Sequence, residues 1–491
     1  MNHRHLLALL LIVLATLSLP SAFATLRVVP VISSHMVLQR EKPAPIWGTS
    51  DPGARVTVRF ADQKHTTRAD ADGHWQVTLR PMPASTRPQT LTIQSGRERL
   101  VMEDVLVGEV WIAGGQSNME FNMGPVWRGG STNKVDRPKY GPNIQQQELD
   151  RAEAPLMRTL LVEKQHCDTL PATGWVNIDS ETLPSMTACG YFFAKNLIDS
   201  LQVPVGIINS CWGGSRIESW TPESYYLSDP LLSPRVHDHR FDTQTIGDMW
   251  QGMIRPLAPF ALRGLIWYQG ESNLTNSLTD LYPRMERLLV QSWRDHWQDP
   301  ELAFYCVQLA PYSYSARRSD LHPHTFVELP EFREMQVRAL DSIPHSGIAL
   351  TLDLCDNVRD IHPTYKWELG RRLALQALCK TYGRQDLQCD GPVFQSAVIQ
   401  GNELRITFAT HGLDLVAAEG RESDLAPCFM VADRRHRFIP VNSARIEGNA
   451  VLLDISHIQG PTAVRFGWDE DIVTNLRDTR GLPASQFTHT L

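Results

Sequence analysis

Hydrophobic and polar positions alternate along the first and last parts of the chain, and this period of two predicts β-strands in both. Residues 55–60 and 75–79 place an apolar side chain at every second position, and turn-forming residues separate them. The alternation returns at residues 404–408. We therefore predict a small β-sandwich-like module over residues 25–104 and a second β-rich module over residues 391–491.

The middle of the chain has a different pattern, in which short apolar runs end in turns that contain Gly or Ser and are followed by helical segments. The expected strands are residues 109–113, 205–208, 265–268 and 347–352. Apolar residues four apart predict a packing helix over residues 364–379. Such alternation predicts an α/β domain over residues 105–390, with a parallel sheet and helices on its faces. Two polar stretches, residues 122–142 and 221–242, are expected to be surface insertions.

The first residues have the pattern of a secretory signal. Arg4 precedes an apolar run over residues 6–19, and small residues end at Ala24. We predict a signal peptide over residues 1–24 and an exported mature chain, periplasmic or secreted. The alternative is an N-terminal membrane anchor, but the run is shorter than the roughly 20 apolar residues that a span needs. No later stretch is apolar enough, so no membrane span is expected after cleavage.

Composition narrows the function classes. The 491 residues are 42% hydrophobic and 21% charged, which is typical of a globular protein. A net charge of -7 gives no basic surface for neutralising phosphates, so nucleic acid is not an expected partner. The 8 cysteines show no zinc-binding spacing, and no metal is expected. Cys379 and Cys389 are the nearest pair in sequence, and they either form a small bridge or stay free.

One serine lies where α/β proteins place their reactive groups. The strand at residues 109–113 runs into Gly114 and Gly115, and the turn that they allow brings Ser117 to the carboxyl edge of the sheet. Ser117 is therefore a candidate nucleophile, although the surrounding residues are not the GxSxG of the elbow hydrolases. From these residues alone, a serine that caps the next helix is the competing interpretation.

A serine nucleophile needs a base, and His362 is the candidate. His362 precedes Pro363, which favours an extended conformation. In extended chain Asp360 and His362 point to the same side, and a carboxylate beside an imidazole orients it and stabilises its cation. The alternative is a solvated acid next to a helix-initiating His-Pro pair.

Acyl transfer also needs donors for an oxyanion. The loop at residues 211–215 offers the N–H of Gly214, and Gln269 offers a side-chain amide; both follow expected strands of one sheet. Taken singly, a Gly-Gly pair is an ordinary turn, and Gln269 is an ordinary polar cap.

Four blocks of sequence now carry a family resemblance. They are, in order, residues 115–119 (GQSNM), 213–220 (GGSRIESW), 267–273 (WYQGESN) and 360–363 (DIHP) with Lys366. Together they resemble the sialate O-acetylesterase family of SGNH hydrolases. Residues 36–40 with 47–48, and residues 475–476 with 481–484, also resemble members of that family, so the likeness covers nearly the whole mature chain.

The resemblance implies a flavodoxin-like catalytic domain that removes acetyl groups from sugar hydroxyls without a cofactor. Matched motif to motif, Ser117 is the nucleophile and His362 the base. The oxyanion hole is formed by the N–H groups of Ser117 and Gly214 and the side chain of Gln269. The usual superfamily Asn of the third block is replaced here.

The identity of the acid is open at this point. The superfamily usually has its acid three residues before the histidine, where this chain has Arg359. Asp360 is the first choice. Glu271 is the supporting or alternative acid, because related acetylxylan esterases use a glutamate of that block to hold the histidine.

The predicted partner is an acetylated sugar or glycan, and Arg216, Glu218 and Trp220 are expected to line its cleft. The acetylated sugar could belong to a sialoside, to xylan or another hemicellulose, or to pectin. Two other classes of function are also considered: a glycosidase that uses Glu271 and Asp360 as its two carboxylates, and a non-catalytic carbohydrate-binding protein. The sequence assigns no oligomeric state.

Overall fold

The computed structural model describes residues 25–124, 144–165, 172–235, 245–275, 279–317 and 323–491. The predicted signal peptide and Cys167 lie outside these residues. No helix within them is both long and apolar enough to cross a membrane. Every cysteine that they include is free, and this holds for Cys379 and Cys389.

The N-terminal module consists of two small sheets. One joins β1 (Arg27–Val28), β3 (Ala44–Thr49) and β6 (His74–Leu79). The other contains β2 (Val37–Gln39), β4 (Arg55–Phe60), β5 (Gln63–Arg68), β7 (Ser85–Ser95) and the first half of β8 (Glu98–Gly115). Inward positions of β4 and β6 are buried and their outward positions largely exposed, as the alternation predicts.

Strand β8 connects this module to the central sheet without a break. Its first half pairs with β7, whereas residues 109–115 pair with β11. Asp104, with φ of 54°, lies at an irregularity in the pairing with β7, which continues to Val107. Beyond it the strand is buried on both faces, which is typical of a central parallel strand. The N-terminal module and the central domain accordingly share one hydrophobic core.

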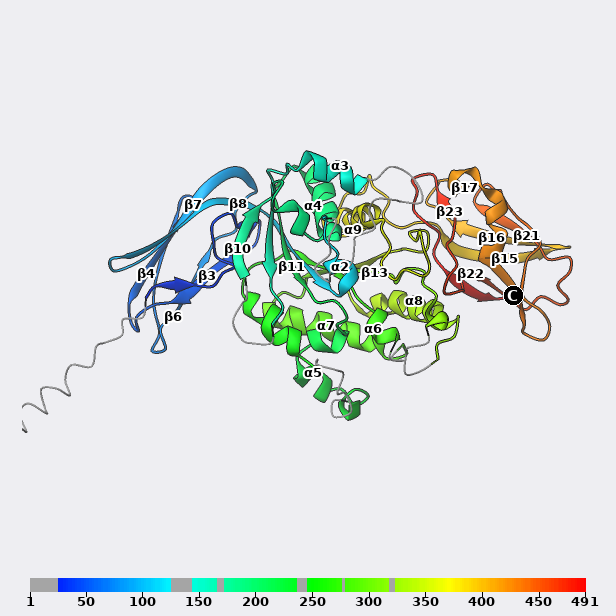
Figure 1. The fold of residues 1–491 in the computed structure, drawn as a ribbon, viewed down its shortest axis with the longest axis horizontal. Helices are drawn as coiled ribbons and strands as arrows, with labels where there is room; N and C mark the ends of the chain where they lie inside the picture. Colours follow the sequence, from blue (N-terminus) through cyan, green and yellow to red (C-terminus); the bar gives the residue numbers. More distant parts are fainter. Residues whose placement is uncertain (1–24, 125–143, 166–171, 236–244, 276–278, 318–322) are drawn as a thin grey trace, which may run out of the picture.

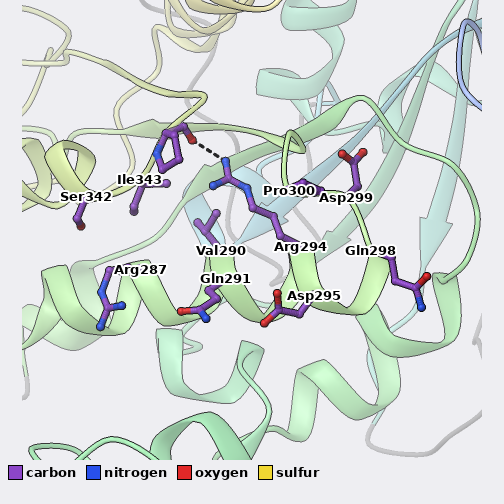
Figure 2. A pocket seen from close by; sticks show the side chains of 11 residues that line it. Arg287, Val290, Gln291, Arg294, Asp295, Gln298, Asp299, Pro300, Ser342 and Ile343 are labelled. Atoms are coloured by element: carbon purple, nitrogen blue, oxygen red, sulfur yellow. Dashed lines mark hydrogen bonds between the residues drawn. The ribbon is translucent and has the colours of Figure 1, made fainter.

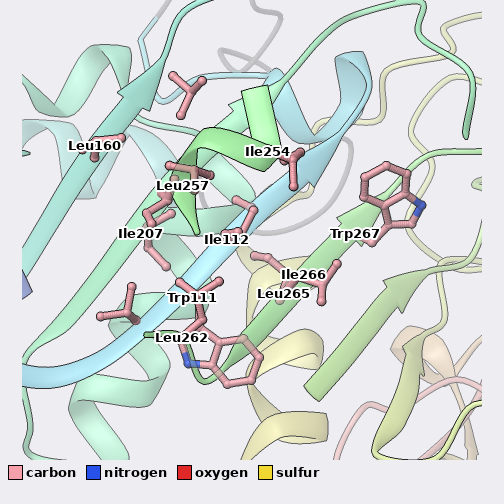
Figure 3. Close-up of a cluster of buried hydrophobic side chains, with 14 of the residues drawn as sticks. Trp111, Ile112, Leu160, Ile207, Ile254, Leu257, Leu262, Leu265, Ile266 and Trp267 are labelled. Atoms are coloured by element: carbon pink, nitrogen blue, oxygen red, sulfur yellow. The ribbon is translucent and has the colours of Figure 1, made fainter. Parts of the chain in front are cut away.

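The central sheet has the order β10-β9-β11-β8-β12-β13-β14. Its further strands are β9 (Met157–Val162), β10 (Ala172–Asn177), β11 (Val205–Cys211), β12 (Gly264–Tyr268), β13 (Ala303–Val307) and β14 (Ser346–Ala349). All pairs are parallel except that of β10, an antiparallel edge strand. The predicted α/β domain with a largely parallel sheet is confirmed. Figure 3 shows the apolar side chains of these strands, with Trp111 and Trp267 among them, packed into the core.

Helices cover both faces of the sheet (Figure 1). Helices α4 (Ala188–Leu201) and α9 (Lys366–Lys380) lie together on one face, and α7 (Tyr282–Trp297) and α8 (Glu328–Ala339) lie together on the other. Helix α9 confirms the helix predicted from Pro363 onward. The short helices are α2 (Ser117–Glu120), α3 (Ile144–Arg151), α5 (Glu223–Leu227) and α6 (Glu271–Leu274).

The C-terminal module is built differently, because it has its own hydrophobic core. One sheet joins β15 (Val393–Gln400), β16 (Glu403–Ala409), β21 (Ala450–Asp454) and β20 (Ala444–Glu447). A second joins β19 (Phe438–Pro440), β18 (Phe429–Ala432), β22 (Ala463–Phe466) and β24 (Phe487–Thr490), and β17 (Leu415–Ala417) pairs with β23 (Leu476–Asp478). Hydrogen bonds join this module to the central domain, for example Thr474 N to Leu352 O at 3.0 Å.

Candidate active site

The carboxyl end of β8 turns sharply into α2, and glycine makes the turn possible. Gly115 has φ of 128°, and a Cβ atom there would lie 2.2 Å from the carbonyl oxygen of Tyr268 on the neighbouring strand β12. Any larger residue would therefore push the strands apart. The turn makes Gln116 the N-cap of α2 and Ser117 its first residue, so Ser117 does not cap the helix.

The side chain of Ser117 meets the imidazole of His362. The distance from Ser117 Oγ to His362 Nε2 is 2.9 Å, across 245 residues of sequence. Ser117 is 8% exposed, and the side chain of His362 is 23% exposed. Phe121 stacks on the imidazole with ring centroids 6.1 Å apart. The two groups thus form a hydrogen-bonded pair that one apolar ring supports and that solvent can reach.

Asp360 lies on the other side of the imidazole. Its Oδ1 accepts a hydrogen bond from the backbone N–H of His362 at 3.1 Å and lies 3.9 Å from His362 Nδ1. The carboxylate is close enough to stabilise a charged imidazole, although the ring contact is longer than a hydrogen bond. Such contacts often tighten when substrate binds.

Glu271, the other candidate acid, belongs to a different set of contacts. Its Oε1 accepts a hydrogen bond from Asn118 Nδ2 at 2.6 Å, and within the described parts of the chain its Oε2 has no hydrogen-bond partner. The residue is 4% exposed, and burial raises the pKa of its carboxyl above the ordinary value. The carboxylate of Glu271 therefore supports the loop of Ser117 and makes no hydrogen bond to the histidine.

Asn118 belongs to the first sequence block, residues 115–119, and its contacts in the structure give it a role. Its Nδ2 also donates to Ile361 O at 3.0 Å, and its Oδ1 accepts from Lys366 Nζ at 2.7 Å. Burial lowers the pKa of Lys366, while Glu271 acts to raise it. Asn118 thus connects the serine loop, the histidine loop and two buried charges of opposite sign. Its position directly after the serine was the only signal in the sequence.

The loop after β11 brings backbone N–H groups beside the serine loop. Trp212 N donates to Gly115 O at 3.0 Å, and Gly213 N donates to Glu120 Oε2 at 2.7 Å. Gly214 follows with φ of 76°. Among the described residues, the N–H groups of Gly214 and Ser117 have no intramolecular acceptor. These two N–H groups can donate hydrogen bonds to a developing oxyanion, whereas that of Gly213 already donates to Glu120.

Gln269 does not present its amide in this arrangement. It is 0% exposed, and its Nε2 donates to Asn273 Oδ1 at 2.7 Å, with Gln116 Oε1 at 3.1 Å and Ser215 O at 3.2 Å also in reach. Its Oε1 accepts from the hydroxyl of Tyr282 at 3.0 Å. In this structure the amide, with two hydrogens and three acceptors, braces the loops together. The oxyanion role of Gln269 stays a prediction.

The three residues expected in the substrate cleft are buried. Trp220 is 0% exposed, donates its indole N–H to Ser215 Oγ at 2.9 Å and packs edge-on against Trp267. Glu218 is 2% exposed and accepts from Asn273 Nδ2 at 2.8 Å, and Arg216 is 7% exposed. The structure places this block in the support beneath the site, where Trp220 has no surface to offer a sugar.

Two other features lie away from these residues. Asp70, Asp72 and His74 form the one group of three ligand-type side chains within metal-binding distance in the described chain, and they are exposed on the N-terminal module. A cavity of about 560 Å³ lies beside the C-terminal half of α7 (Figure 2). There Arg294 donates to Leu302 O at 2.9 Å and to Pro344 O at 2.6 Å, just before β13 and β14 begin. This cavity is at the amino edge of the sheet, opposite Ser117.

The comparisons with known proteins agree with one another. The family model described as "carbohydrate esterase, sialic acid-specific acetylesterase" matches residues 107–379. The sialate O-acetylesterase of Pongo abelii is 28% identical over 481 residues, which cover 91% of this chain and 88% of that protein. The sialate O-acetylesterase of Homo sapiens is 28% identical over 483 residues, with the same coverage.

A solved structure extends the likeness to both flanking modules. The crystal structure of a carbohydrate acetylesterase from Xanthomonas citri is 33% identical to this chain, with a TM-score of 0.79. The match covers 95% of this chain and 99% of the other. The order of N-terminal module, α/β domain and C-terminal module is therefore common to the two proteins.

Proposed function

The chain belongs to the carbohydrate esterase family of sialic acid-specific acetylesterases, and from this premise we propose that it is an exported O-acetylesterase that uses Ser117 as its nucleophile. Members of the family are carboxylic-ester hydrolases, which replaces the alternatives of a glycosidase and of a non-catalytic binder. The observation that carries the proposal is the 2.9 Å contact between Ser117 Oγ and His362 Nε2 at the carboxyl edge of the sheet.

The proposed reaction has two steps. His362 Nε2 takes the proton of Ser117 as the hydroxyl oxygen attacks the acetyl carbonyl, and the N–H groups of Ser117 and Gly214 stabilise the oxyanion. His362 then gives its proton to the departing sugar oxygen, and an acetyl-enzyme remains. Water that His362 deprotonates attacks this ester, releases acetate and restores the serine.

Asp360 is the proposed acid of the triad. Its carboxylate lies within 3.9 Å of His362 Nδ1 and holds the histidine backbone. It therefore favours the imidazolium that forms in both steps. Glu271 contributes indirectly, since its hydrogen bond goes to Asn118. Gln269 contributes by bracing the loops that carry the donors.

Export and the identity of the sugar complete the proposal. The predicted signal peptide over residues 1–24 supports export, and acetylated glycans outside the cell are accessible to an exported enzyme. The proposed substrate is an acetyl ester on a sugar hydroxyl, and our first choice for the sugar is a sialoside. The alternative substrates are the acetyl esters of xylan, other hemicelluloses and pectin.

The test is acetate release from acetylated sialosides, acetylated xylan and acetylated pectin by the wild type and by Ser117→Ala. We expect release from at least one of these substrates and a loss of at least about 10³-fold in the variant. Equal release by the two proteins would refute the assignment of Ser117. No release from any substrate by a folded wild type would refute the carbohydrate ester as substrate.

A further inference from the structure

A second cavity, of about 720 Å³, lies where α9 and the loop before it meet the C-terminal module. Its central-domain wall includes Leu354, Tyr365 and Trp367, and its other wall includes residues 473–475. Figure 1 places the C-terminal sheets beside α8 and α9. The loop that carries Asp360 and His362 runs between Leu354 and Tyr365, so this cavity and the proposed catalytic pair share one chain segment.

The charged lining of this cavity has one more arginine than it has carboxylates. Its lining contains Arg371, Arg372, Arg421, Arg477 and Arg480 together with Asp353, Glu368, Glu419 and Asp424. The first three arginines pair with these four carboxylates. No ion pair between described residues involves Arg477 or Arg480. In a protein of net charge -7, the cavity therefore carries a local excess of positive charge.

Three polar atoms on the C-terminal wall have no hydrogen-bond partner among the residues that the structure describes. They are Thr474 Oγ1, Asn475 Oδ1 and Arg477 Nε. Thr474 is only 2% exposed and Asn475 only 7% exposed, so bulk water does not satisfy them fully. Buried donors and acceptors without partners cost free energy unless a ligand or ordered water pairs with them. The donors and acceptors here suit hydroxyl groups and an anion.

The central-domain wall adds an aromatic pair. Trp367 is partly exposed, and Tyr365 packs edge-on against it with ring centroids 5.3 Å apart. An aromatic face beside hydroxyl-binding groups fits the ring of a sugar, whereas an inorganic anion would leave it unused. Arginine recognises a carboxylate through paired hydrogen bonds.

We propose that this cavity is an accessory subsite for a carboxylate-bearing sugar unit, a uronate or sialate residue of the glycan. The inference rests on the proposed function, because it gives that function a preference for anionic glycans. Arg477 and Arg480 bind the carboxylate, Thr474 and Asn475 bind hydroxyl groups, and Trp367 contacts the sugar ring. A glycan held here has its remaining units near the segment that carries His362.

The first test is titration calorimetry on the full Ser117→Ala chain with free sugars, which carry no acetyl ester to hydrolyse. Probes are N-acetylneuraminic acid, galacturonic acid, galactose and inorganic phosphate. We expect an anionic sugar to bind at least about tenfold more tightly than galactose or phosphate, since loss of a charge-assisted hydrogen bond is an effect of that size. Phosphate that binds as tightly as the sugars would overturn the saccharide assignment.

Variants locate the site. Arg477→Ala with Arg480→Ala should weaken binding of the anionic sugar by about tenfold or more. Arg480→Ala alone, at an exposed position, should weaken it less and leave folding unchanged. Arg445→Ala is the matched control, because that arginine is in the same module but pairs with Glu403 elsewhere. Unchanged binding in the double variant would overturn the proposal.

Measurements of turnover test the accessory subsite and the proposed function separately. With Ser117 intact, the double variant should hydrolyse p-nitrophenyl acetate as the wild type does, while its KM for an acetylated anionic oligosaccharide rises about tenfold at constant kcat. A wild type without any esterase activity would contradict the proposed function. An active wild type and a double variant with the same KM would contradict the subsite alone.

Discussion

The reactive groups and the network beneath them differ in how the protein holds them. The side chains of His362 and Asp360 are each 23% exposed. Asn118, Gln269 and Glu271 are at most 4% exposed. Asn118 and Gln269 each make several hydrogen bonds, and Glu271 accepts one from Asn118. We therefore expect the geometry of the proposed catalytic side chains to depend on this buried hydrogen-bond network. Variants of the first group should lose activity, and variants of the second should also lose stability.

The largest effect on turnover, apart from that of the serine, is expected for His362→Ala. Without the imidazole nothing takes the proton of Ser117, so hydrolysis of p-nitrophenyl acetate should fall by roughly 10³-fold or more. The unfolding midpoint should barely change, because the side chain is partly exposed. A variant within tenfold of the wild type would show that another group is the base.

A smaller effect is expected for Asp360→Asn, and Glu271→Gln is its matched control. Loss of the carboxylate should lower kcat by roughly 10- to 100-fold, since its contact with the ring is longer than a hydrogen bond. In Glu271→Gln the amide oxygen can still accept from Asn118, and turnover should stay within a few-fold of the wild type. The reverse order of these two losses would make Glu271 the acid.

Asn118→Ala should change activity and stability together. The variant loses the hydrogen bonds to Glu271, Ile361 and Lys366 and leaves two charged groups buried without their shared partner. We expect roughly 2–4 kcal/mol of lost unfolding free energy by urea titration and a kcat lowered at least tenfold. Full stability with lowered kcat would contradict the contrast between the two groups.

Substitution of Glu286 on α7 should have the smallest effect on turnover. It should strongly change how the stability of the protein depends on pH. This residue is 0% exposed, and neither of its carboxyl oxygens has a hydrogen-bond partner in the part of the chain that the structure describes. Burial raises its pKa from 4.5 to about 8. Between these values the folded protein keeps a proton that the unfolded chain releases. The unfolding free energy should therefore fall as pH rises, by about 1.4 kcal/mol per pH unit from this group.

Glu286→Gln removes this titration while keeping the side-chain volume. The difference in unfolding free energy between variant and wild type should grow in favour of the variant from pH 5 to pH 8 and level off above it. Kinetic constants at pH 6 should be equal in the two proteins. Parallel stability profiles across this range would show that the carboxyl of Glu286 is not protonated in the folded state.

The sequence predicted the elements of the fold more fully than the orientation of side chains. The buried parallel strands and the helix after Pro363 could be predicted because the hydrophobic pattern of each element is set by the residues of its own segment and by which of them are buried. The pairing of Ser117 with His362 was predicted from the family resemblance that the ordered motifs carry, because the two residues lie 245 positions apart and residues 360–363 do not directly follow a strand. Strand β8, in contrast, runs through the expected boundary at residues 104 and 105, since a strand can belong to two sheets at once.

The directions of Gln269, Trp220 and Asn118 could not be predicted from their positions in the chain. An amide at a strand end can face a substrate or an inner loop, and the choice depends on acceptors such as Asn273 and Ser215, which come from other segments. Trp220 matched a motif that also carries core residues, and its burial arises from packing against Trp267. Contacts of this kind exist only once the loops have met.

The most direct test of the central claim is labelling with an aromatic phosphonate that reacts with activated serines, followed by peptide mass spectrometry. The account predicts one adduct per chain, on Ser117, with acetate release lost in proportion to labelling, and slow labelling of Ser117 in His362→Ala. An adduct on another serine, or full esterase activity in a chain labelled at Ser117, would contradict it.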